Sequence, residues 1–137
     1  MANDDLLYEY AVVRYVPRVD REEFVNIGLL MMCKRRKWLR GEIMLNRDRI
    51  RALYPHADLD MLSSKASLFM RDDVPFRDIP VEERYRWLTA VKSAVLQVSP
   101  SHPGVIIQAE RDKDSEGGAY SGLLEREFQR LFRDLIL

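Results

Sequence analysis

Four polar residues around the first predicted turn form the sharpest local pattern in the sequence. Arg14 lies near the end of one predicted strand and Asn26 near the start of the next, with Arg21 and Glu23 between them. Because a tight turn brings the ends of paired strands within side-chain reach, these groups can converge at one edge of the sheet. Such a cluster would bind an anion or a carboxylate, and Glu23 would then serve as an acid or base.

The same residues also fit a purely structural role. An ion pair between arginine and Glu23, with Asn26 satisfying backbone groups of the turn, would fix the register of the hairpin. Exposed ion pairs and turn amides are mostly structural, so we favour this interpretation.

A second feature is the segregation of charge in an otherwise neutral chain. Residues 34–51 contain eight bases and two acids, which is 8 − 2 = +6, while the whole chain has a formal net charge of +0. Trp38 lies among these bases, and an exposed tryptophan beside cations could stack on a nucleobase or contact an acidic partner. The structural alternative is a charged turn that protects a sheet edge from aggregation. The bases are Lys34, Arg35, Arg36, Lys37, Arg40, Arg47, Arg49 and Arg51.

The first third of the sequence predicts three antiparallel strands that position these residues. Residues 6–16 and 38–45 have the composition and alternation of strands. Residues 24–33 are apolar at both odd and even positions, which is typical of a central strand covered on both faces. Gly28 and Gly41 inside strands indicate a bulge or the close approach of a packed helix.

After residue 45 the apolar period becomes nearly that of a helix. We expect Asn46 and Asp58 to cap two short helices, and a third helix to follow Pro80 and end before Pro100. Residues 104–109 predict a short edge strand, and residues 120–136 a final amphipathic helix.

Length and composition favour one α+β domain, with an antiparallel sheet of three or four strands packed against helices. The chain has 137 residues, of which 47% are hydrophobic, enough for a sizeable core. We expect a strand-rich part over residues 1–45 and a mainly helical part over residues 46–137. Cys33 is the only cysteine, so an intrachain disulfide and a multi-thiolate metal site are excluded. With an acidic N-terminus and no long apolar run, we expect a cytoplasmic protein without membrane segment, metal or cofactor.

The run RYVPRVDREEFVNIG, from Arg14 to Gly28, closely resembles the signature of the bacterial domain of unknown function 3037 family. The likeness is strong over residues 8–33 and loose across the helical middle, and the last helix with Leu131-Phe132 is similar to the rest of the pattern. Arg18 stands where the family usually has an acidic residue. The resemblance implies no established activity, and it implies a small partner protein of a HipA-like kinase.

We therefore expect a non-catalytic interaction or accessory module that contacts another protein through the basic turn and the edge of the first strand. The C-terminal aliphatic residues 135–137 would suit docking on the protein's own core or on a second copy. The first alternative is a binder of nucleic acid or phosphate ligands that uses residues 34–51. The second is a small enzyme that uses Arg14, Arg21, Glu23 and Asn26.

Overall fold

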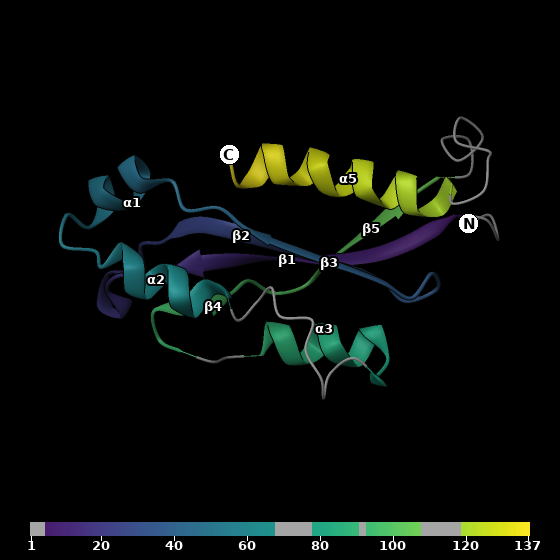
Figure 1. Ribbon diagram of the computed structural model, residues 1–137, viewed down its shortest axis with the longest axis horizontal. Helices are drawn as coiled ribbons and strands as arrows, with labels where there is room; N and C mark the ends of the chain where they lie inside the picture. Colours follow the sequence, from purple (N-terminus) through teal and green to yellow (C-terminus); the bar gives the residue numbers. More distant parts are fainter. Residues whose placement is uncertain (1–4, 68–77, 91–92, 108–118) are drawn as a thin grey trace.

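The computed structural model describes residues 5–67, 78–90, 93–107 and 119–137, and it confirms a single α+β domain (Figure 1). All strand pairs are antiparallel, in the order β3-β2-β1-β4, with β5 also pairing with β1. The strands are β1 (Leu6–Tyr15), β2 (Val25–Cys33), β3 (Trp38–Ile43), β4 (Leu96–Val98) and β5 (His102–Ile106).

Strands β4 and β5 lie one after the other along the same edge of β1. Leu96 is paired with Tyr15 and His102 with Tyr10, so the pairing slips by one residue between the two segments. The slip occurs around Ser99, whose backbone N–H donates to Val12 O at 2.8 Å. The buried Ser99 hydroxyl in turn accepts a bond from Val12 N at 2.9 Å. A side chain thus replaces a backbone acceptor where the edge strand is interrupted.

The predicted central position of β2 is confirmed, since β2 lies between β1 and β3. Its register against β1 shifts between Val13 and Arg14, opposite Gly28. The shift exchanges the two faces of β2, so Ile27 and Leu29 point into different cores although both positions are odd. A Cβ on Gly28 would collide with the Ile43 side chain and lie 2.9 Å from Glu42 O, which explains why glycine stands there.

Helices cover both faces of the sheet. Helix α5 (Ala119–Leu135) lies along one side, and α2 (Leu59–Ala66) and α3 (Val81–Thr89) lie along the opposite side (Figure 1). Helix α1 (Arg47–Leu53) contributes Ile50 to the core of α2 and α3. A single-turn helix, η1 (Val19–Arg21), forms the connection between β1 and β2.

The two predicted helix caps are confirmed. The Asn46 side chain accepts a bond from Arg49 N, and the Asp58 side chain accepts one from Met61 N, each at 3.0 Å. These bonds satisfy backbone donors that have no partner in the first helical turn.

The prediction of one long third helix was wrong. Helix α3 ends at Thr89, and the apolar residues assigned to its last turns include β4, residues Leu96–Val98. Leucine and valine at helical spacing also fit a strand, and here the open edge of β1 supplies backbone partners that a helix would not use. The first strand consequently offers no free edge over β4 and β5, which corrects the expected contact through that edge.

We predict that Ser99→Ala destabilises the protein by roughly 1–3 kcal/mol, because the buried N–H of Val12 loses its acceptor. The free energy of unfolding in urea measures this cost. Ser63→Ala, at an exposed position of α2, is the control and should change stability by less than about 0.5 kcal/mol. Equal stabilities of the two variants would contradict this role for the Ser99 hydroxyl.

Candidate functional site

The four polar residues of the first turn divide into two groups. Arg21 and Glu23 form an exposed ion pair, with 2.5 Å between Nε and Oε1. Arg14 and Asn26 are cross-strand partners further along the hairpin, on the side of the sheet that α5 covers. The structure therefore brings Arg21 close to Glu23 and places Arg14 opposite Asn26. The two pairs contact different parts of the molecule.

Asn26 and Arg49 hold the C-terminal end of α5. Asn26 Nδ2 donates to Leu135 O at 3.2 Å, and Arg49 Nη1 donates to Ile136 O at 2.9 Å. These carbonyls lie at a helix end, where acceptors lack intrahelical partners and carry partial negative charge. Asn26 is thus positioned to fasten the helix to the sheet.

Arg14 supports an exposed aromatic ring. Its guanidinium carbon lies 4.2 Å from the centroid of the Phe24 ring, a cation–π arrangement. The Phe24 side chain is nevertheless 45% exposed. The ring is thus held in place while much of its surface faces solvent.

Two adjoining hollows lie between the β1–β2 turn and the end of α1. One has a volume of about 400 Å³ and the other about 490 Å³, and Ala52 and Leu53 line both. Arg21 and Glu23 line the first hollow, and Asn26 the second. We call these hollows, with the exposed Val19 and Phe24, the turn surface. The other lining residues are Pro17, Arg18, Tyr54, Pro55, His56, Val25 and Arg49.

The basic segment 34–51 is divided between two ends of the molecule. The turn of Lys34, Arg35, Arg36 and Lys37 connects β2 to β3 at one end of the sheet, and α1 lies at the other (Figure 1). Six strand residues separate them, a span of roughly 20 Å. That distance exceeds the Debye length of about 8 Å at physiological ionic strength, so the two groups of bases do not act as one field.

Trp38 and Arg40 both contact α5. The Trp38 ring meets Phe128 edge-on, with 6.5 Å between centroids. Arg40 Nε lies 3.2 Å from Glu125 Oε2, and its guanidinium carbon lies 4.6 Å from the Phe128 centroid. These contacts engage the tryptophan ring and one of the cations that the nucleic-acid alternative would use, so the geometry favours a structural role for both.

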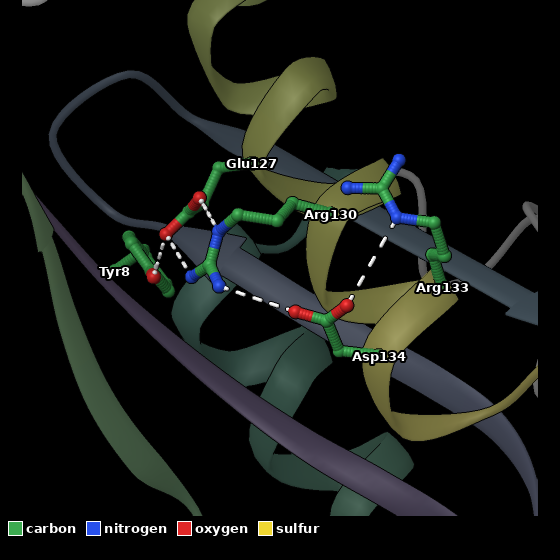
Figure 2. Close-up of polar contacts among 5 residues, drawn as sticks. All are labelled: Tyr8, Glu127, Arg130, Arg133 and Asp134. Atoms are coloured by element: carbon green, nitrogen blue, oxygen red, sulfur yellow. Dashed lines mark hydrogen bonds and ion pairs between the residues drawn. The ribbon is translucent and has the colours of Figure 1, made fainter.

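A polar network along one side of α5 and β1 was not found by sequence reasoning (Figure 2). The Tyr8 hydroxyl donates to Glu127, and Arg130 forms a two-pronged ion pair with the same carboxylate, at 2.7 and 2.9 Å. Arg130 also approaches Asp134 at 3.5 Å. Gly104 leaves space for the Tyr8 ring, which a Cβ would enter. The spacing of Glu127 and Arg130 on one helix was visible in the sequence, but their strand partner was not.

Burial and these bonds change the protonation equilibria of the network. The hydrogen bonds from Arg130 are the largest influence on Glu127 and lower its pKa. Burial, followed by the bond to Glu127, raises the pKa of Tyr8 far above its usual value. At neutral pH, Tyr8 therefore stays a donor and Glu127 an acceptor, which is the combination that ties β1 to α5.

A second polar chain joins α3 to the sheet. Tyr85 and Ser101 share a hydrogen bond of 2.8 Å, and Ser101 donates to Glu9 at 3.0 Å. Burial raises the pKa of Tyr85 to about 12. Ser101 is thus bound to Tyr85 and Glu9, whereas the neighbouring His102 ring lies 5.2 Å from that of Tyr10.

Comparison with known proteins identifies the family. The profile of a family described as "Protein of unknown function (DUF3037)" matches residues 10–115. The chain belongs to this family. The DUF3037 match spans both hollows of the turn surface and ends before α5. No curated protein and no solved structure matches the chain. Among the helices of the described ranges, none is long and apolar enough to cross a membrane.

We predict that Glu127→Gln lowers the free energy of unfolding at pH 7 by about 1 kcal/mol, because a partly exposed charge-assisted network is weakened. The folded-state pKa of Glu127 lies below the reference value of 4.5, so its contribution is fully present above pH 4.5. This contribution is lost as the pH falls through the folded-state pKa. The free energies of unfolding of wild type and Glu127→Gln should therefore converge at that pH.

Urea unfolding at a series of pH values measures the difference, with the exposed Glu22→Gln as the control. A constant gap between wild type and Glu127→Gln from neutral to acidic pH would contradict the assignment.

Proposed function

We propose that this protein is a non-catalytic accessory module that binds another protein through the turn surface. The observation that carries the proposal is the exposed Phe24 ring, held by Arg14 beside two open hollows. Aromatic and arginine side chains dominate the energetics of protein–protein binding, especially where a ring is already held in its bound position.

Apolar residues line both hollows. Val19 in η1 is 53% exposed and Phe24 is 45% exposed, and Pro17 and Pro55 line the first hollow. Isolated exposed apolar residues are ordinary, but a group of them around a concave surface is typical of an interaction site. An extended segment of a partner could place an apolar side chain in this hollow.

Two charged pairs lie in the connection between β1 and β2, and three of their four residues line the first hollow. Arg18 Nη2 lies 2.6 Å from Asp20 Oδ2, and Arg21 pairs with Glu23. The hydrogen bond from Arg18 lowers the pKa of Asp20, so this acid stays charged. Exposed pairs of this kind add little to stability, and a polar rim around an apolar centre is typical of protein interfaces. The rim therefore supports recognition by a partner that carries complementary charges.

The contacts of the four predicted residues favour this role over the enzyme alternative. Glu23, the proposed acid or base, is paired with Arg21, and Asn26 is bonded to the end of α5. A catalytic base must reach a substrate proton, whereas these groups reach their own scaffold. We extend the proposal to the partner that the family resemblance implies, a HipA-like kinase, as the first protein to test.

We predict that Phe24→Ser reduces partner capture by about tenfold or more, as expected for loss of a central aromatic contact. Wild type and variants would be immobilised and exposed either to a lysate of the source organism or to a purified HipA-like kinase. Mass spectrometry would then quantify the proteins that each one retains. Met61→Ser is the matched control, because Met61 is 38% exposed on α2 and lines neither hollow.

A second variant separates this surface from the basic turn. Lys34→Glu/Lys37→Glu changes two exposed residues at the other end of the sheet. A partner lost from Phe24→Ser alone would support the turn surface. A partner lost only from the lysine variant would overturn the turn surface as the site, and capture that no variant changes would overturn the interaction through either region. Thermal unfolding would verify that each variant is folded.

A further inference from the structure

The outer edge of β5 is an apolar strand edge without charge. Residues 102–107 include no Asp, Glu, Lys or Arg. The opposite edge strand, β3, carries Arg40 and Glu42. Charged side chains on edge strands prevent pairing with other chains, and an uncharged edge lacks that protection. Among the described residues, no strand pairs with the outer edge of β5.

The positions of the backbone groups on this edge follow from the neighbouring bonds. Val12 O accepts from Ser99 N, and Val16 N donates to Val95 O. The even-numbered residues of β1 therefore direct their backbone N–H and C=O groups towards β4 and β5. In the register of β5, Tyr8 is opposite Gly104 and Tyr10 opposite His102. The alternate residues of β5 then direct their N–H and C=O groups outward. Pro103 is one of them, and its lack of an N–H costs nothing on an open edge.

Three exposed apolar side chains accompany these outward groups. Val105 is 43% exposed, Ile107 49% and Leu7 54%, and Leu7 is the cross-strand partner of Val105. Leu7 and Val105 share one face of the sheet, and Ile107 directly follows the end of β5. An apolar strip beside open backbone groups matches the strand-addition mode of recognition, in which backbone bonds and alternate side chains both contribute.

We propose that β5 pairs antiparallel with β5 of a second copy of this chain, with Val105 at the two-fold axis. In this register the two Val105 residues exchange both backbone bonds, and each Ile107 N–H reaches the Pro103 carbonyl of the other copy. Valine meets valine and isoleucine meets proline across the axis, so the strip is self-complementary.

Charge also favours a second copy as the occupant. The strip contains no charge that would select an oppositely charged partner, and the chain's formal net charge of +0 gives no overall repulsion between copies. The dimer would join two sheets edge to edge and leave the turn surface, at the far end of β1, open to another protein. Its small interface predicts a reversible, concentration-dependent association.

Sedimentation velocity of the full chain over a range of concentrations tests the proposal. Wild type should shift from the monomer mass of 16.1 kDa towards twice that value as concentration rises. Val105→Glu places like charges opposite each other at the axis and should weaken dimerisation by about tenfold or more. Met61→Glu adds the same charge at another exposed apolar position and should dimerise as wild type does.

Charge complementation tests the register itself. A mixture of Val105→Glu and Val105→Lys should form a mixed dimer that neither variant forms alone, because opposite charges then meet at the axis. Wild type that stays monomeric at every concentration would overturn the proposal. A dimer that Val105→Glu does not weaken, or a mixture that does not associate, would overturn it as well.

Discussion

Strand β1 is hydrogen-bonded along both edges and covered on both faces, and the rest of the molecule is arranged around it. It pairs with β2 on one side and with β4 and β5 on the other. Its side chains alternate between the core under α5 and the core under α1, α2 and α3. A buried backbone group without a partner costs about 1–3 kcal/mol, so a strand in this position requires neighbours on both sides. The interruption at Ser99 is tolerated because a hydroxyl supplies the missing acceptor.

Helix α5 completes the core on one face, although it lies outside the matched family region. The match ends at residue 115, and α5 begins at Ala119. Phe128 and Leu124 are fully buried against β1 and β2. Polar contacts determine where the helix lies: Tyr8 reaches Glu127, Arg40 reaches Glu125, and Asn26 reaches Leu135. These directional bonds connect α5 to β1, β2 and β3. Apolar packing alone would allow the helix to slide or rotate on the sheet.

The division of the basic segment changes how its charge acts. A run of bases along the sequence indicates a basic patch, but the strand between the turn and α1 separates its two parts. Arg40 is paired with Glu125, and Arg49 caps a carbonyl of α5. Part of the excess charge therefore stabilises the attachment of α5. The exposed groups at the two ends of the sheet would meet different partners.

Local signals in the sequence determined the strand composition of the first third, the central position of β2 and the caps at Asn46 and Asp58. Each depends on neighbouring residues alone: apolar runs on both parities, or a side chain that bonds its own backbone. The β4 strand, the parity change at Gly28 and the partners of Asn26 and Glu127 were decided only by tertiary structure. They depend on residues far apart in the chain, such as Leu96 beside Tyr15 and Tyr8 beside Glu127. The segment Leu96–Val98, whose apolar spacing predicted a helix, forms a strand on the edge of β1. Backbone hydrogen bonds and burial across the sheet outweigh its local propensity.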